Sequence, residues 1–158
     1  MKNLVLIVAA ALCFAACNNA DQQSNGKTNT DSSGKNDLSL EQRRNALSDS
    51  ANFTTIEWID STFRNMGDAK EGEKVEVNYK FKNTGTHNLI LSDVQPSCGC
   101  TTPEWPKQPI APGEEGVIKA VFDSNHRVGE NMKQITVQAN TNPLTTMMLT
   151  FRVNVVKN

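Results

Sequence analysis

The stretch Lys74-Val-Glu-Val-Asn-Tyr-Lys-Phe-Lys-Asn83 alternates apolar and polar side chains over most of its length. Val75, Val77, Tyr79 and Phe81 fall on one side of this pattern, and charged or amide side chains fall on the other. A period of two is that of a β-strand with one buried and one solvated face. Such strands are typical of antiparallel sheets. The stretch therefore predicts one strand of an antiparallel sheet.

The same alternation recurs on both sides of this stretch. Further strands are predicted at residues 53–59, 89–94, 117–122, 133–139 and 147–155. Asn83-Thr84-Gly85 supplies a turn, and Ala111-Pro112-Gly113-Glu114 places Pro and Gly as a type II turn requires. Six or seven short strands separated by turns indicate an all-β, immunoglobulin-like β-sandwich. We assign this domain to residues 51–158 and interpret Trp58 and Tyr79 as packing residues.

The first 17 residues predict an exported, lipid-anchored chain. One lysine precedes an uncharged run from Leu4 to Leu12, and small residues precede Cys17, as in a secretory signal peptide. The apolar run is shorter than the roughly 20 residues that a membrane-spanning helix needs. Phe14-Ala15-Ala16-Cys17 resembles a bacterial lipobox, in which the cysteine is lipidated and becomes the first residue. Cys13 is a poorer candidate because bulky Leu12 precedes it.

Residues 18–50 are predicted to be a flexible linker from the lipid to the domain. Residues 18–37 contain a single apolar side chain, Ala20, so they cannot bury enough surface to offset the entropy of ordering. Within this linker Leu38, Ser39 and Gln42 form a capping-box pattern, which predicts a short helix over residues 39–47. The formal charge of −1 and the absence of a basic stripe give no indication of nucleic-acid binding.

Cys98-Gly99-Cys100 is the one local motif with candidate chemistry. If Cys17 is lipidated, Cys98 and Cys100 have only each other as disulfide partners in an oxidising compartment. The Cα atoms of two such residues in an extended strand lie about 6.6 Å apart, and Gly99 permits a bend that brings them closer. A disulfide that closes a three-residue ring stabilises the fold by only about 1.6 kcal/mol, because so short a ring restricts the unfolded chain little. A local structural bridge or buried thiol pair, a thiol–disulfide redox site and a metal site all remain open.

The metal interpretation needs further ligands. His87 and His126 are the only histidines, and each falls in a predicted loop. No Cys-x-Cys…His-x-His spacing of a zinc site is present. We therefore assign no metal ligand, no cofactor and no catalytic residue.

A series of motifs is spread along the domain: Phe81-x-Asn83-x-Gly85, Leu89, Val94, Ser97-Cys98-Gly99-Cys100-Thr101, Ile110-x-Pro112-Gly113-Glu114, Phe122-Asp123, Gly129, Lys133-x-Ile135 and Asn140. Together these motifs resemble those of a known bacterial family, domain-of-unknown-function family 1573. The resemblance covers residues 55–156. This family is common in Bacteroidetes lipoproteins and is similar to Hydin-type and major-sperm-protein-type immunoglobulin-like domains. It implies an interaction or scaffold module, and it leaves the role of the cysteine pair unassigned.

These observations predict a cell-envelope lipoprotein, with its domain in the periplasm or at the cell surface. The expected partners are membrane lipid, through Cys17, and an unidentified envelope protein. The expected role is that of a non-enzymatic binding or structural module. The alternatives are a thiol–disulfide protein that uses Cys98 and Cys100 and, less favoured, a metal-binding protein.

Overall fold

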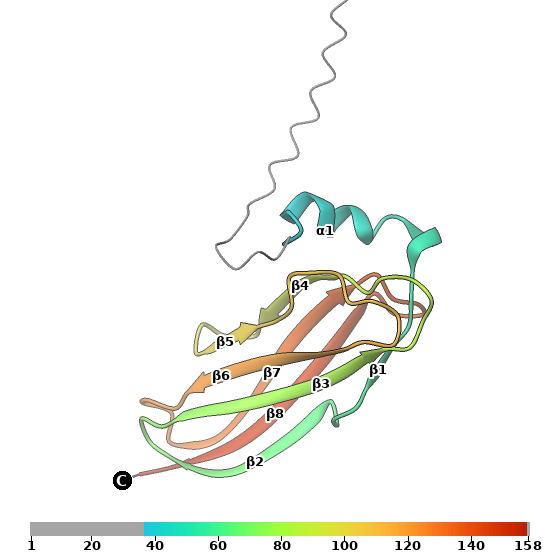
Figure 1. Ribbon diagram of the computed structural model, residues 1–158. Coiled ribbons are helices and arrows are strands. Elements are labelled where there is room, and N and C mark those ends of the chain that lie inside the picture. Colours follow the sequence, from blue (N-terminus) through green and yellow to red (C-terminus); the bar gives the residue numbers. More distant parts are fainter. Residues whose placement is uncertain (1–36, 158) are drawn as a thin grey trace, which may run out of the picture.

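Strand β3, Lys74–Asn83, forms where the alternation predicts it (Figure 1). The computed structural model describes residues 37–157; the predicted signal peptide, Cys17 and linker residues 18–36 lie outside the described residues. Val77, Tyr79 and Phe81 are at most 1% exposed, and the side chains between them face solvent.

Two four-stranded sheets pack face to face. One has the order β1-β3-β6-β5, with β1 Ile56–Trp58, β6 Glu115–Asp123 and β5 Thr101–Glu104. The other has the order β2-β8-β7-β4, with β2 Phe63–Lys70, β8 Thr146–Val156, β7 Gly129–Ala139 and β4 Leu91–Pro96. All neighbours are antiparallel except β2 and β8, which are parallel. The predicted all-β, immunoglobulin-like sandwich is confirmed.

Residues 37–157 form eight strands where six or seven are predicted. The additional strands are β2 and β5, both at sheet edges. In β2 only Ala69 is buried, and a register shift between Asn65 and Asp68 interrupts the pairing with β8. The predicted strand 53–59 is reduced to β1, because the chain leaves this sheet after Trp58 and joins the other sheet as β2.

Aromatic side chains fill the space between the sheets. The ring of Phe122 meets that of Phe151 edge to face, with centroids 5.8 Å apart, and so joins the two sheets. Half-buried Trp58 packs edge-on against Phe81 at 5.6 Å. The Phe81 ring also lies over Gly116, its cross-strand partner, where a Cβ atom would overlap the ring. Gly116 is therefore required by close packing.

The outer faces of the two sheets differ in charge. The face of β1-β3-β6-β5 carries Glu76, Lys80, Lys82, Glu115 and Lys119 among its outward side chains. The centre of the β2-β8-β7-β4 face is uncharged; its outward side chains are Phe63, Gln95, Gln134, Thr136, Met148 and Thr150. Charged groups lie toward the margins of this face, as in the Arg152–Glu130 ion pair at 2.9 Å. We call this central group of six residues the uncharged face.

Helix α1, Leu40–Ala46, lies within the predicted range 39–47 and packs beside β4 (Figure 1). Ser39 and Gln42 form the reciprocal hydrogen bonds of a capping box, at 3.2 and 2.8 Å. Ser92 on β4 donates to the carbonyl oxygen of Arg43 at 2.7 Å. A short 3-10 helix, η1 Ser50–Asn52, then leads to β1. The described part of the predicted linker thus rests on the sandwich.

No helix within residues 37–157 is long and apolar enough to cross a membrane.

Candidate functional site at the Cys98–Cys100 turn

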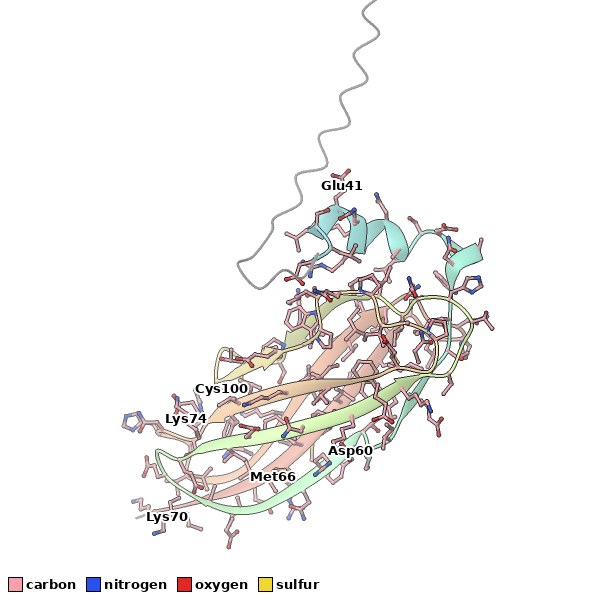
Figure 2. The ribbon with its side chains drawn as sticks, viewed as in Figure 1. Glu41, Asp60, Met66, Lys70, Lys74 and Cys100 are labelled. Atoms are coloured by element: carbon pink, nitrogen blue, oxygen red, sulfur yellow. A yellow bond between two sulfur atoms is a disulfide. The ribbon has the colours of Figure 1, made fainter. Side chains whose placement is uncertain are left out.

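The Cys98-Gly99-Cys100 turn connects the two sheets at one end of the sandwich. It follows the end of β4 at Pro96 and precedes β5, which begins at Thr101. Since β4 and β5 belong to different sheets, these few residues carry the chain across the edge of the domain. Figure 2 shows Cys100 near the end of the domain that also carries Lys74.

The turn brings the two cysteines together. Their sulfur atoms lie within bonding distance, and their Cα atoms are 5.2 Å apart, closer than in an extended strand. The bend expected at Gly99 is therefore present. Cys100 is 7% exposed and packs against the core, whereas Cys98 is half-buried. Cys98 is thus the more accessible sulfur.

A hydroxyl group lies beside both sulfurs. The Oγ1 atom of Thr101 is 3.8 Å from Sγ of Cys98 and 3.9 Å from Sγ of Cys100. Thr101 is only 3% exposed, so this hydroxyl is shielded from solvent. Sequence reasoning named Thr101 as part of the motif but assigned it no role; its contact with both sulfurs depends on the turn.

Backbone hydrogen bonds hold the turn at both ends. The Asp123 N–H donates to the Cys100 carbonyl at 2.8 Å, and the Thr101 N–H donates to the Cys98 carbonyl at 3.3 Å. On the other side Ser97 and Gln134 exchange two hydrogen bonds, at 2.8 and 3.1 Å. The turn is therefore fixed to both sheets independently of any bond between the sulfurs.

An ion pair adjoins the turn. Lys74 Nζ lies 2.6 Å from Oδ2 of Asp123. The hydrogen bond from Lys74, followed by that from the Asn125 N–H, lowers the pKa of the Asp123 carboxyl. Lys133 Nζ lies 5.7 Å from the ring centroid of Phe122, the cross-strand partner of Thr101. The surroundings of the turn are thus charged, with cations on both flanking sheets.

The structure does not bring the two histidines to the cysteines as ligands. Both are exposed in loops, as predicted. His87 Nδ1 contacts the hydroxyl of Thr86, and His126 Nδ1 lies 3.8 Å from Glu71. Within residues 37–157 no group of three or more His, Cys, Asp or Glu side chains is placed to hold a metal ion.

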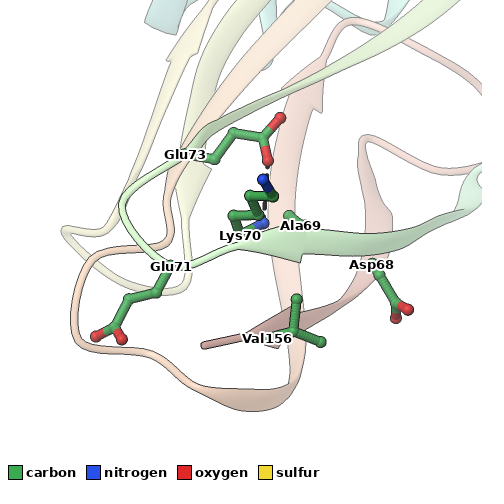
Figure 3. A pocket seen from close by; sticks show the side chains of 6 residues that line it. All are labelled: Asp68, Ala69, Lys70, Glu71, Glu73 and Val156. Carbon is green, nitrogen blue, oxygen red and sulfur yellow. Dashed lines mark hydrogen bonds between the residues drawn. The ribbon is translucent and has the colours of Figure 1, made fainter. Parts of the chain in front are cut away.

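An open hollow lies at the connection between β2 and β3, which belong to different sheets. Asp68, Lys70, Glu71, Glu73 and Val156 line it together with Ala69 (Figure 3). Its carboxylates stabilise local structure. Glu73 accepts from the Lys70 N–H at 3.0 Å, Asp68 from the Asn154 side chain at 2.9 Å, and Glu71 from the His126 N–H at 3.2 Å. These hydrogen bonds therefore hold the connection between β2 and β3.

At the opposite end of the sandwich two buried asparagines join the loops. Asn83 donates to the carbonyl oxygens of His87 and Ile110, at 2.8 and 2.9 Å. Asn140 accepts from the Ile90 N–H at 2.7 Å and donates to the carbonyl oxygens of Asn52 and Asn88. These two motif residues are structural, because their side chains replace missing backbone pairing.

A second cluster, which the sequence did not predict, lies where α1 meets the loop after β5. The ammonium group of Lys107 lies over the ring of Trp105, and the Lys107 carbonyl accepts from the Leu38 N–H at 3.4 Å. Burial, followed by the nearby charge of Arg43, lowers the pKa of Lys107 to about 8, against the opposing influence of Asp93 and Asp37. No sequence periodicity places α1 on this loop.

The free sheet edges are poorly suited to pairing with another strand. On β4, Pro96 lacks an N–H and the Val94 N–H donates to the Asp93 carboxylate at 2.9 Å. On β5, Pro103 faces the free edge, because the alternate residues pair with β6. β2 carries its bulge, and β1 is three residues long. Such features discourage strand addition.

The fold and the turn define an immunoglobulin-like β-sandwich module with a cysteine pair at one end. The chain belongs to the family described as protein of unknown function (DUF1573), whose model matches residues 56–155. The predicted family resemblance is therefore confirmed. A search of curated proteins finds no match.

Solved structures show the same fold at low sequence identity. A protein of unknown function from Porphyromonas gingivalis W83 is 18% identical, with a TM-score of 0.59, over 66% of this chain and 48% of that chain. This chain thus spans about half of that protein. A PapD-like domain of human CEP192 is 11% identical, with a TM-score of 0.55, over 68% of this chain and 89% of that domain. At these identities the comparison describes the fold alone.

Proposed function

We propose that this chain is a cell-envelope lipoprotein whose immunoglobulin-like domain is a non-enzymatic module that binds another envelope protein. The observation that carries this proposal is the uncharged face. Phe63 and Met148 are 48% and 54% exposed there, beside threonine and glutamine side chains. Apolar and uncharged polar groups cost less to desolvate than charged groups, so such a surface suits a protein partner with a similarly uncharged surface.

The protected edges support recognition through a face. A partner that added a strand would need a row of free backbone groups, and Pro96, Pro103 and the β2 bulge interrupt those rows. The opposite outer face is less suitable, because its ion pairs, such as Lys119–Glu76 at 2.8 Å, would have to be desolvated. The uncharged face is therefore the preferred surface for a protein partner.

The lipobox-like sequence at Cys17 supports the envelope part of the proposal. A diacyl or triacyl group on this residue would supply the two or more chains that stable anchoring requires. The domain would then meet partners in or near the same membrane. Binding at high local concentration needs only a modest surface.

Site-specific photocrosslinking in intact cells tests the binding proposal. A photoreactive amino acid replaces Met148 on the uncharged face, and a matched chain carries it at Val117, which is 40% exposed on the other sheet. We expect a discrete covalent adduct with one envelope protein from position 148 and not from position 117. The adduct should disappear when Thr150→Glu places a charge beside the crosslinker. Equal adducts from both positions, or none from position 148, would refute the proposal.

Fatty-acid labelling tests the anchor separately. Cells that express the full chain are grown with an alkyne-tagged palmitate, and the chain is then isolated. We expect label in the native chain and none in Cys17→Ser, with Cys13→Ser as the matched control that retains the label. Label that persists in Cys17→Ser would show that the anchor is elsewhere.

A further inference from the structure

We infer that Cys98 and Cys100 are a reversible dithiol–disulfide pair that exchanges electrons with an external dithiol, with Cys98 as the sulfur that is attacked. This activity does not rest on the proposed partner binding, because it uses Cys98, Cys100 and Thr101, none of which belongs to the uncharged face, although the neighbouring Ser97 is hydrogen-bonded to Gln134 of that face. Three structural features carry the inference: the unequal exposure of the two sulfurs, the Thr101 hydroxyl, and the support of the turn by both sheets.

The unequal exposure sets the direction of attack. Exchange needs an approaching thiolate to reach one sulfur while the other leaves. Cys98 is half-buried and packs against the core cluster from outside, whereas Cys100 is 7% exposed and is a member of that cluster. An incoming thiolate therefore meets Cys98 first, and Cys100 becomes the leaving group.

The Thr101 hydroxyl is placed to stabilise that leaving group. Its oxygen lies 3.9 Å from Sγ of Cys100 and 3.8 Å from Sγ of Cys98. A hydroxyl donor beside a sulfur favours the thiolate over the thiol, and a better-stabilised thiolate leaves faster. Because Thr101 is nearly fully buried, water does not compete for this donor.

The supporting hydrogen bonds make the exchange reversible. The Asp123 N–H holds the Cys100 carbonyl at 2.8 Å, and the Ser97–Gln134 pair holds the end of β4. When the sulfur–sulfur bond opens, these contacts keep the two thiols close, so the bond can form again without refolding. A ring of three residues restricts the unfolded chain little, so its opening has little effect on the fold.

The exchange proceeds in two balanced steps. A thiolate of the external dithiol attacks Sγ of Cys98; a mixed disulfide forms, the Cys98–Cys100 bond breaks, and its electron pair remains on Cys100, which takes up a proton. The second thiolate of the dithiol then attacks the first sulfur of the dithiol, which is bonded to Sγ of Cys98 in the mixed disulfide. Cys98 is released and is also protonated. The external dithiol leaves as a disulfide, and two electrons and two protons have passed to the pair.

The test uses the full chain with Cys13→Ser and Cys17→Ser, so that only the pair can react. The folded chain is equilibrated with dithiothreitol and its oxidised form at a series of ratios, and free thiols are trapped with a maleimide of known mass. We expect two labels to appear together, and to disappear together on reoxidation, while the circular dichroism spectrum is unchanged. A pair that is labelled only after denaturation would overturn the inference.

Single-cysteine variants test which sulfur is attacked. Each is added to an aromatic disulfide reagent, whose coloured thiolate reports the rate. Cys98, left alone in Cys100→Ser, should react at least about tenfold faster than Cys100, left alone in Cys98→Ser. Equal rates, or a faster Cys100, would overturn the assignment of Cys98.

Thr101 variants test the hydroxyl in the chain that retains both cysteines. Thr101→Val should slow reduction by dithiothreitol severalfold, whereas Thr101→Ser should stay within about twofold of the parent. The thermal midpoint of each variant shows whether it is folded. Unchanged reduction in a folded Thr101→Val would exclude a role for the hydroxyl.

Discussion

The hydroxyl of Thr54 donates a hydrogen bond of 2.8 Å to Oδ1 of Asn83, inside the sandwich and across 29 residues of sequence. The Thr54 N–H in turn donates to the carbonyl oxygen of Asn140 at 3.0 Å. Thr54 therefore joins the two buried asparagines that hold the loops at this end. The segment that precedes β1 is an integral part of the domain as a result.

Replacing Asn83 should be among the most destabilising polar substitutions in the domain. Asn83→Ala removes the hydrogen bonds to the carbonyl oxygens of His87 and Ile110 and to the buried hydroxyl of Thr54, although Ile110 keeps the Leu89 N–H. We expect a loss of about 3 kcal/mol or more in the free energy of unfolding, measured by urea denaturation. Thr54→Val should cost about 1 kcal/mol, since Oδ1 of Asn83 keeps the Gly85 N–H.

The matched control is Thr55→Val, whose hydroxyl contacts only the exposed Thr84 side chain. It should change the free energy of unfolding by less than about 0.5 kcal/mol. If Asn83→Ala and Thr55→Val have the same effect, the buried network does not stabilise the fold.

Two glycines should respond differently to an added methyl group. At Gly116 a Cβ atom would overlap the Phe81 ring, so Gly116→Ala should destabilise the domain by about 1–3 kcal/mol. At Gly99 no heavy atom lies within 4 Å of such a Cβ atom, so Gly99→Ala should be close to neutral. Thermal denaturation of both variants makes the comparison. A Gly116→Ala chain as stable as Gly99→Ala would contradict this packing.

Sequence alone predicts the strands that have two neighbours in a sheet and, with shifted bounds, the edge strands β1 and β4. In β3 and β8 one face is buried throughout, so the hydrophobic alternation from Val75 or Leu149 onward is uninterrupted. The edge strands β2 and β5 carry no such signal. Gly67 has a positive φ of 70° within the β2 bulge, and Pro103 interrupts β5. Their strand conformation comes from tertiary pairing.

The features of the candidate site also fall into those that the sequence predicts and those that depend on tertiary contacts. The turn at Gly99 and the pairing of its flanking cysteines follow from residues that are adjacent in sequence. The unequal exposure of the two sulfurs and the position of the Thr101 hydroxyl depend on how β5 pairs with β6. The hydrogen bond between Leu38, just before α1, and Lys107 joins segments more than 50 residues apart, and no local pattern encodes it.

Tyr79 permits a clean test of burial, because it is the only tyrosine in the sequence. It is fully buried, and its hydroxyl has no hydrogen-bond partner among the described residues. Burial raises its pKa from 10.0 to about 12, against a smaller opposing influence of Arg64. Absorbance of the folded chain near 295 nm should therefore titrate near pH 12, and a midpoint near 10 would contradict this burial.

The same shift predicts how stability changes in alkali. The pKa of Tyr79 is higher in the folded chain than in the unfolded chain. Its contribution to the free energy of unfolding is therefore complete below pH 10 and is lost as the pH rises toward 12. Two pKa units correspond to about 2–3 kcal/mol. Tyr79→Phe should lack this loss relative to the parent, and at pH 7 it should be neutral or more stable by up to about 1 kcal/mol, since it removes a buried hydroxyl without a partner.

Lys107 should couple the docking of α1 to pH, with the opposite sign. Its pKa is lowered to about 8, first by burial and then by the charge of Arg43, while Asp93 and Asp37 oppose the shift. The folded state therefore disfavours the ammonium form, so stability should rise as the pH increases from about 8 toward 10.5. Fluorescence of Trp105 reports this ionisation in a Trp58→Phe chain, because the Lys107 ammonium lies over the Trp105 ring. We expect a fluorescence transition near pH 8 that is absent in Lys107→Met. A transition near pH 10.5 instead would mean that Lys107 is solvated and that α1 is not docked beside it.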